Sequence, residues 1–204
     1  MKLSNCILFK GTKTVIDNID IVNLPNGFII ANEGDKSYRM GIILSGHVLI
    51  KAYTSGGKHF TVNSLKEGDI FGDMLIFSNE YDSYPGALIT VGETKVAFIE
   101  HKVFKEMILH DKVLLNSFLN LLSNKSVKMN YKSKLLSQDS VRDKILFYLH
   151  QEKRVQKTDI IALNMTKEEL ANILFIQRPS LSRELIKMKV EGLIDYDRYT
   201  ITIK

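Results

Sequence analysis

The stretch ILFIQRPSLSREL, residues 173–185, decides the fold of the C-terminal part of the chain. An apolar cluster runs into Arg178 and Pro179, and a segment with helical spacing follows. Proline fits the first turn of a helix, because the N–H groups of that turn have no acceptor within the helix. Two arginines, Arg178 and Arg183, frame this start. The stretch is compatible with a plain amphipathic helix or with a helix that enters a DNA groove.

The residues before this stretch predict a capped helix. Thr166 is followed three positions later by Glu169, which is the spacing of a capping box. In such a box the threonine hydroxyl accepts from a backbone N–H, and the glutamate reaches back to the cap. A helix is therefore expected to start at Thr166, and Ile173 to Ile176 are expected to form a tight turn.

The residues after the turn predict a second helix and a hairpin. Leu181, Leu185 and Met188 lie at positions i, i+4 and i+7, which gives the helix one buried face. Gly192 is expected to end it. The remaining segment, residues 193–204, has the pattern of a small two-stranded hairpin.

Helix, turn, helix and hairpin in this order are typical of a winged helix-turn-helix. In such a unit the second helix lies in the major groove, with its N-terminal residues toward the base edges. Arginine can pair bidentately with guanine, and serine can serve bases or phosphates. We therefore favour the DNA-binding interpretation. The candidate DNA-binding residues are Arg178, Ser180, Ser182, Arg183, Thr166 and Lys187.

The first 110 residues have a different pattern, with short apolar runs separated by turn residues. Several such runs with glycine at the corners predict an antiparallel sandwich or jelly roll. The expected strands are residues 41–53, 59–65, 87–91 and 96–100, and the expected turns are TSGGK (54–58), KEGD (66–69) and GETK (92–95).

Helical spacing begins at His101. Residues 101–110 predict one helix, residues 111–137 a long helix without Gly or Pro, and residues 140–151 another amphipathic helix. The long segment carries a stripe that is apolar in its first half and lysine-rich in its second. The stripe could cover the barrel, but a partner helix is the favoured interpretation. The expected dimer residues are Leu114, Phe118, Leu121 and Leu122.

Composition and charge are those of a globular protein with an uneven distribution of charge. The formal net charge is +5, and all of the excess lies after residue 110, which suits a polyanion in that half. No apolar run is long enough to span a membrane, and the apolar start before Lys10 is too short for a signal peptide, so we expect a cytoplasmic protein. The single cysteine, Cys6, excludes an intrachain disulfide and is expected to be a small, partly buried apolar residue rather than a redox group.

The chain resembles the bacterial cyclic-AMP receptor protein / fumarate-nitrate regulator (Crp/Fnr) family over essentially its whole length. The resemblance lies in NEGDKSYRMGIILSGHVLI (32–50), LKEGDIFGDM (65–74) and TKEELANILFIQRPSLSRELIKMKVEGLI (166–194). It implies an α+β fold with three parts. These are a cyclic-nucleotide-binding-like antiparallel β jelly roll as sensor domain (1–110), a long dimerisation helix (111–137) and a winged helix-turn-helix DNA-binding domain (138–204).

The resemblance also implies a function. It identifies a homodimeric, sequence-specific transcription regulator that binds a DNA site of two-fold symmetry, with RNA polymerase as a further partner. Arg178 and Arg183 fall on the family's two base-contacting arginines. Pro179 stands where the cyclic-AMP-responsive members carry a glutamate that reads cytosine. Proline offers no acceptor, so the recognised DNA sequence should differ at that position.

The cassette that holds the ligand in cyclic-nucleotide-binding members departs from their pattern. The family uses a glutamate for the ribose and an Arg-Ser pair for the cyclic phosphate. Asp73 stands at the ribose position, and residues 79–87 contain no basic residue. A buried phosphate without a paired cation is costly, and Glu80 and Asp82 add negative charge. We expect an effector other than cyclic AMP, in a pocket formed by Gly72, Asp73, Met74, Tyr84 and Pro85.

Other ligands and activities find little support in the sequence. The five histidines show no metal-ligand spacing, and a single cysteine cannot hold an iron–sulfur cluster, so no metal or cofactor is expected. No nucleophile motif, phosphate loop or dinucleotide fingerprint occurs, and no enzymatic activity is expected. Two alternatives stay open. One is an effector-independent regulator with a purely structural barrel, and the other is a jelly-roll metal-dependent enzyme.

Overall fold

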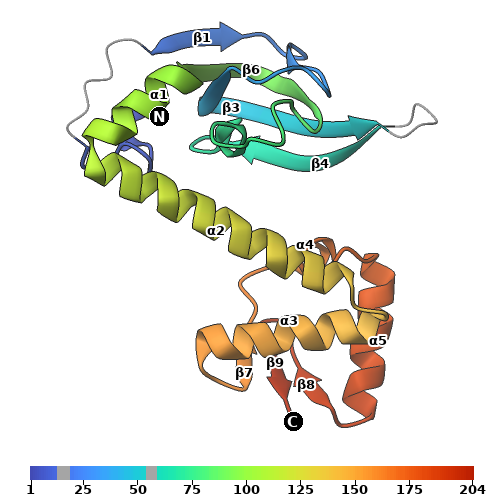
Figure 1. Ribbon diagram of the computed structural model, residues 1–204. Helices are drawn as coiled ribbons and strands as arrows, with labels where there is room; N and C mark the ends of the chain where they lie inside the picture. The colour runs from blue at the N-terminus through green and yellow to red at the C-terminus, as the bar shows by residue number, and fades with distance from the viewer. Residues whose placement is uncertain (13–18, 54–58) are drawn as a thin grey trace. The chain divides into compact units, whose positions relative to one another are not determined.

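The computed structural model describes residues 1–12, 19–53 and 59–204 (Figure 1). The chain divides into two compact units, Met1–Ser123 and Asn124–Lys204. The division falls within the long helix α2 (Lys112–Leu136). None of the helices in the described ranges has both the length and the apolar character that a membrane span requires.

Unit 1 is built on an antiparallel sheet. Among the described residues its strands follow the order β1-β6-β3-β4, with β2 also paired to β6 and β5 to β3 (Figure 1). The strands are β1 (Asp20–Leu24), β2 (Ile29–Ala31), β3 (Arg39–Tyr53), β4 (His59–Lys66), β5 (Ile70–Phe71) and β6 (Ala87–Glu100). Two short 3-10 turns, η1 (Leu3–Asn5) and η2 (Asp73–Leu75), and helix α1 (His101–His110) complete the unit with the start of α2.

The sequence predicts the strands on either side of residues 92–95 correctly, but the turn between them is wrong. β6 is one continuous strand, because the last two of the predicted turn residues pair with neighbouring strands. Thr94 pairs with Leu24 of β1, and Lys95 pairs with both Asn23 and Ser45. The register between β3 and β6 shifts on both sides of Ser45. Bulges in the pairing therefore accommodate Gly92 of the predicted turn without ending the strand. The missing information is the pairing partner, which lies far away in the sequence.

The other two predicted turns differ in outcome. The KEGD turn is confirmed, because β4 ends at Lys66 and β5 begins at Ile70. Gly68 has φ +89°, and the Asp69 carboxylate accepts from the backbone N–H of Lys66 (2.8 Å). The TSGGK turn lies outside the described residues.

The core of unit 1 includes the start of α2. Leu114 and Phe118 are 0% and 2% exposed, and the Phe118 ring lies 4.9 Å from the ring of Phe104 in α1. The prediction that these two residues line a dimer seam is therefore wrong. Their stripe covers the barrel of the same chain, which is the alternative that the apolar pattern had left open. Cys6 is fully buried in the same apolar cluster, whereas the sequence predicted only partial burial.

Unit 2 contains the predicted helices and hairpin. Its elements after α2 are α3 (Val141–Gln156), β7 (Ile160–Ala162), α4 (Lys167–Ile173), α5 (Arg178–Val190), β8 (Ile194–Tyr196) and β9 (Thr200–Ile203). Leu181, Leu185 and Met188 are buried, as the spacing predicts. The hairpin of β8 and β9 is confirmed, and β7 adds a third strand to it on the far side of β9. β7 is too short to give a periodic pattern in the sequence.

Candidate DNA interface and ligand cassette

Helix α4 starts with the predicted capping box. The Glu169 N–H donates to Thr166 Oγ1 (3.2 Å), while the Thr166 N–H and hydroxyl donate to Glu169 Oε2 (2.7 and 2.8 Å). These two donors hold the pKa of Glu169 below its usual value, the backbone N–H having the larger effect. The Thr166 hydroxyl proton is thus used within the cap.

The turn between α4 and α5 is fixed by a left-handed residue. Phe175 has φ +54°, and the Ile176 N–H donates back to the Ala171 carbonyl (3.0 Å). Leu174 is fully buried beneath the turn, and the Lys132 ammonium lies 4.9 Å from the centre of the Phe175 ring. α5 then begins at Arg178, with Gln177 as its N-cap and Pro179 in its first turn.

Both predicted base-reading arginines extend from α5 into solvent. The only contacts recorded for their guanidinium groups among the described residues are weak: Arg178 Nε lies 3.8 Å from Glu168 Oε2, and Arg183 Nη2 lies 3.5 Å from Ser180 Oγ. The Arg178 side chain is 63% exposed. Neither guanidinium is held in a tight internal pair, so both can be offered to a ligand.

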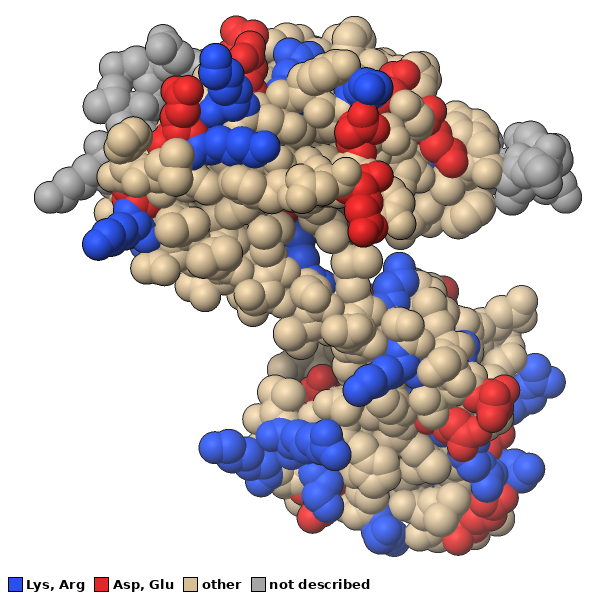
Figure 2. Space-filling view, in the orientation of Figure 1, with Lys and Arg blue, Asp and Glu red and all other residues tan. Residues whose placement is uncertain are grey.

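The remaining predicted DNA residues of α5 are also accessible. Lys187 is exposed, whereas Ser180 and Ser182 are half-buried beside the core face. On the face of unit 2 seen in Figure 2, Lys and Arg side chains are scattered widely, and Asp and Glu gather mainly at one side. The exposed cations of α5 itself include Arg178, Arg183 and Lys187.

Arg142 positions α5 from a neighbouring helix, and no local pattern in the sequence identified it. Its Nε donates to Glu184 Oε1 (2.6 Å), and its Nη1 and Nη2 donate to the two carboxylate oxygens of Glu191 (2.7 and 3.0 Å). Hydrogen bonds to Glu191 and Glu184 stabilise the charged form of Arg142, so the pKa of its guanidinium is raised. The pKa of Glu191 is lowered, chiefly by its hydrogen bond from Arg142.

The tip of the β8–β9 hairpin carries an arginine and an aromatic ring. Asp197 Oδ1 accepts from the backbone N–H groups of Tyr199 and Thr200 (both 2.7 Å), which lowers the pKa of Asp197 and shapes the tip. The Arg198 guanidinium lies 5.4 Å from the centre of the exposed Tyr199 ring. Arg198 is a cation at the wing tip that the sequence interpretation had not selected.

Part of the predicted ligand cassette is occupied by its own side chains. Asp73 and Tyr84 are buried, and the Tyr84 hydroxyl donates to the Arg39 carbonyl (3.0 Å). A Cβ on Gly72 would lie 3.1 Å from that hydroxyl oxygen, so the phenol lies directly against this glycine. Tyr84 was expected to line a ligand pocket, whereas its side chain is buried against Gly72. Met74 and Pro85 are exposed, and none of the five residues lines the cavity where β6 passes into α1.

The charges of the cassette are arranged differently from the sequence expectation. The Lys36 ammonium lies 3.0 Å from Asp82 Oδ2 at the surface, so part of the expected negative charge is compensated. The Arg39 guanidinium lies 3.9 Å from the centre of the Phe98 ring. No arginine of the cassette segment faces Gly72, because residues 79–87 contain none.

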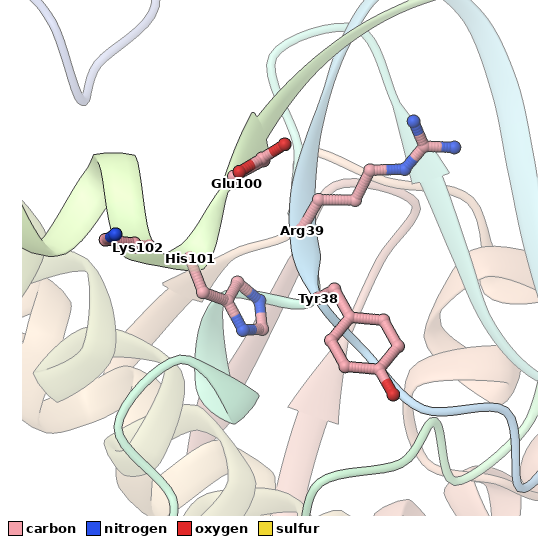
Figure 3. Close-up of a pocket in the computed structure, with 5 residues that line it drawn as sticks. All are labelled: Tyr38, Arg39, Glu100, His101 and Lys102. Atoms are coloured by element: carbon pink, nitrogen blue, oxygen red, sulfur yellow. The ribbon is translucent and has the colours of Figure 1, made fainter.

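A separate cavity of about 430 Å³ lies where β6 passes into α1. Tyr38, Arg39, Glu100, His101 and Lys102 line it. Figure 3 shows the Tyr38 and His101 rings on one side of the strand–helix junction, whereas the Arg39 side chain extends to the other. His101 Nε2 lies 3.5 Å from Ser37 Oγ. Burial lowers the pKa of His101, with a further lowering from Lys105, while a backbone bond to Gly72 opposes both.

An exposed apolar stripe runs along α2, next to the buried one. Leu119, Met129 and Leu136 are 50%, 58% and 48% exposed. The stripe alternates spacings of four and three residues, which is the repeat of a coiled-coil seam. Its members are Leu115, Leu119, Leu122, Ser126, Met129, Ser133 and Leu136. Of the predicted dimer residues, Leu122 belongs to this stripe, and both Leu121 and Leu122 are half-buried against the unit 1 core.

Metal-binding geometry is absent from the part of the chain that the structure describes, since no three His, Cys, Asp or Glu side chains come together in it. His59, one of the five histidines, has no described side chain.

Comparison with known protein families gives two matches. A profile described as "Cyclic nucleotide-binding domain" matches residues 21–111, and one described as "Crp-like helix-turn-helix domain" matches residues 144–204. The first match covers the sheet of unit 1, and the second covers most of α3 and everything after it in unit 2.

Individual relatives agree with these matches. The chain is 25% identical over 170 residues to the "Anaerobic regulatory protein" of Bacillus subtilis, covering 81% of this chain and 71% of that protein. It is 22% identical over 176 residues to the "cAMP-activated global transcriptional regulator Vfr" of Pseudomonas aeruginosa, covering 83% and 82%. Among solved structures, the catabolite activator protein of Thermus thermophilus aligns with TM-score 0.56 and 20% identity, over 97% of this chain and 93% of that chain.

Proposed function

Since the chain belongs to the Crp/Fnr family of DNA-binding transcription regulators, we propose that it works as a homodimer that reads a two-fold symmetric DNA site with α5. One observation carries the proposal. Arg178 and Arg183 extend from the N-terminal half of α5 without tight internal partners, within the segment that matches the Crp-like helix-turn-helix. Acting on DNA, the protein would reside in the cytoplasm.

The two arginines act as the base readers. A guanidinium can donate two hydrogen bonds to the O6 and N7 of guanine, which discriminates against other bases by about 1–3 kcal/mol per contact. Ser180, Ser182 and Lys187 are placed to contact phosphates around this point, and Arg198 offers a further cation at the wing. Thr166 contributes through the capped start of α4.

The exposed stripe of α2 supports the homodimer. Two copies of this helix can bury Leu119, Leu122 and Met129 against each other, and the small side chains of Ser126 and Ser133 permit close approach. A dimer matches a symmetric site because each copy reads one half. We place the sensor domain at 1–110, the dimerisation helix at 111–137 and the DNA-binding domain at 138–204.

The position of Tyr84 in the cassette supports a regulator that is not gated by cyclic AMP. The Tyr84 phenol lies against Gly72, and the segment 79–87 supplies no cation for a cyclic phosphate. An effector of other chemistry, or none, is consistent with this arrangement. An effector-independent regulator is supported by the Tyr84 hydroxyl, which already donates a hydrogen bond to the Arg39 carbonyl within the protein. RNA polymerase is the further partner that family membership suggests, and no enzymatic activity is assigned.

Selection of bound fragments from random DNA by the purified full-length chain tests the proposal. The expected result is an enriched inverted repeat, bound without any added small molecule. Arg183→Ala is the matched variant, and its selected sequences should lose the preference at one base pair per half-site. Absence of any enriched sequence at low and moderate salt would overturn the proposal.

A further inference from the structure

The outermost face of α5 is apolar on both sides of Arg183. Pro179, Arg183, Ile186 and Val190 lie at positions i, i+4, i+7 and i+11, which places them on one narrow stripe of an α-helix. This stripe lies opposite the buried face of Leu181, Leu185 and Met188. Ile186 is 56% exposed and Val190 is 83% exposed, and Pro179 is exposed as well.

Such a stripe departs from what a surface helix usually presents. Single exposed apolar side chains are common and need no explanation. Here, however, the side of the helix farthest from the core, which is normally the most polar, carries three apolar side chains. Arg183 lies among them, and the exposed Lys187 borders them. An apolar face that an arginine interrupts suits a surface with both apolar groups and acceptors.

The major groove of DNA is a surface of this kind. Its acceptors include the O6 and N7 of guanine, and its apolar group is the C5-methyl of thymine. The rise of an α-helix is about 1.5 Å per residue, so Pro179 and Ile186 lie roughly 6 Å and 4.5 Å along the axis from Arg183. Base pairs are spaced by about 3.4 Å. Both side chains therefore reach one or two base pairs from the guanine that Arg183 contacts.

We propose that Pro179 and Ile186 read thymine methyl groups on either side of that guanine. This inference rests on the proposed function and adds the chemistry of the half-site to it. A guanine flanked by thymines within two base pairs is the expected core of each half-site. Pro179 and Ile186 have no donor or acceptor in their side chains, so they suit the apolar methyl groups. The ammonium of Lys187 and the hydroxyls of Ser180 and Ser182 suit polar partners instead.

Substitution of thymine by deoxyuridine tests the proposal, because it removes only the C5-methyl group and leaves the base pairing intact. The site from the DNA selection is used, and the guanine is located from the preference that Arg183→Ala loses. Each thymine within two base pairs of it is replaced in one half-site. Binding of the full-length protein is measured by fluorescence anisotropy at constant salt.

The expected loss is about fourfold in affinity for each methyl that is contacted, the value for burying one apolar carbon. Ile186→Ala should bind the thymine site about as weakly as wild type binds the deoxyuridine site. It should also lose nothing more when that thymine is replaced. Pro179→Ala, which keeps a good helix former in the first turn, should do the same at a thymine on the other side.

Val190→Ala is the matched control, because it removes an exposed apolar side chain one turn farther from the reading end. It should keep the full sensitivity of wild type to deoxyuridine. Equal affinity of wild type for thymine and deoxyuridine at every tested position would overturn the inference and leave DNA binding by Arg183 intact. A selected half-site without thymine within two base pairs of the guanine would overturn it as well. Failure of the selection itself would instead count against the proposed function.

Discussion

Arg142 in α3 holds Glu191 at the C-terminal end of α5 by a two-bond fork, with Nη1 and Nη2 at 2.7 and 3.0 Å from the two carboxylate oxygens. The third donor of the same guanidinium, Nε, reaches Glu184 one and a half to two turns earlier in α5 (2.6 Å). A planar guanidinium suits such bidentate pairing, whereas a lysine would act as a point charge. This arrangement ties α3 to α5 at two points along the helix.

Removal of the fork should loosen α5. Arg142→Met leaves Glu184 and Glu191 without their shared cation, so their like charges repel along one side of the helix. We expect faster hydrogen exchange over residues 184–192, a lower melting temperature and weaker DNA binding. Hydrogen-exchange mass spectrometry reports the first effect directly.

Lys153→Met serves as the control for the loss of an ion pair, because Lys153 forms an exposed pair with Asp159. Exposed pairs of that kind contribute little to stability. Equal exchange rates over residues 184–192 in Arg142→Met and Lys153→Met would show that the fork does not hold α5.

Replacement of Arg183 should change specificity more than general affinity. Arg183→Ala should cost about 1–3 kcal/mol against the preferred site and relax the preference at one base pair of each half-site. Competition between the preferred site and point variants of it measures both effects. If the variant still distinguishes the preferred site from its point variants as wild type does, Arg183 does not contact a base.

Replacement of Lys187 should have the opposite signature. Lys187→Ala should weaken binding to all sequences by a similar factor and reduce the slope of log affinity against log salt by about 1, as expected for one lost phosphate contact. A titration series at several salt concentrations measures the slope. A base-specific effect with an unchanged slope would place Lys187 at a base edge instead.

Local patterns in the sequence predicted the helix-turn-helix well, because its features depend on neighbours in the chain. The capping box of Thr166 and Glu169, the proline in the first turn and the buried face of α5 all depend on residues within two or three turns. The hairpin of β8 and β9 follows from its short turn for the same reason. These local features therefore do not depend on contacts with distant parts of the chain.

What the sequence did not predict depends on partners that are distant in the chain. The continuity of β6 requires pairing with β1 and β3, and the fork of Arg142 joins residues 42 and 49 positions apart. The apolar stripe of Leu114 and Phe118 was recognised, but its spacing is equally suited to a barrel or to a partner helix. Only the packing against Phe104 shows which surface covers it.

Two substitutions on α2 should separate these roles. Phe118→Ala removes a ring from the unit 1 core and should lower the free energy of unfolding by about 3–5 kcal/mol. Leu119→Asp places a charge in the exposed seam and should convert the dimer to a monomer without loss of helical circular dichroism. Sedimentation velocity at micromolar concentration measures the change from dimer to monomer.

Val127→Asp is the matched control for the seam, because Val127 is exposed on α2 but lies off the four-three repeat. It should leave the dimer intact. A monomeric wild type, or a dimer that Leu119→Asp does not disturb, would contradict the seam.

Acid should destabilise unit 1 through His101. Burial lowers the pKa of this imidazole, so the unfolded chain takes up a proton at higher pH than the folded chain does. Stability should therefore be constant above the ordinary histidine pKa, fall as the pH drops through it, and level off below the lowered pKa. Thermal melts of wild type and His101→Gln between pH 8 and roughly pH 5 measure this. A wild-type slope identical to that of the variant would assign the pH dependence to other groups.

Cyclic AMP should not bind to unit 1, and two separate physical reasons lead to this expectation. The Tyr84 phenol occupies the space beside Gly72, and the segment 79–87 lacks a cation for a phosphate stripped of water. Titration calorimetry should show no saturable heat with wild type. Tyr84→Ser empties the space but adds no cation, so it should not bind either. Binding by Tyr84→Ser alone would mean that the phenol is the whole barrier, whereas saturable micromolar binding by wild type would show that neither reason holds, because another group, such as Arg39 released from Phe98, then supplies the positive charge.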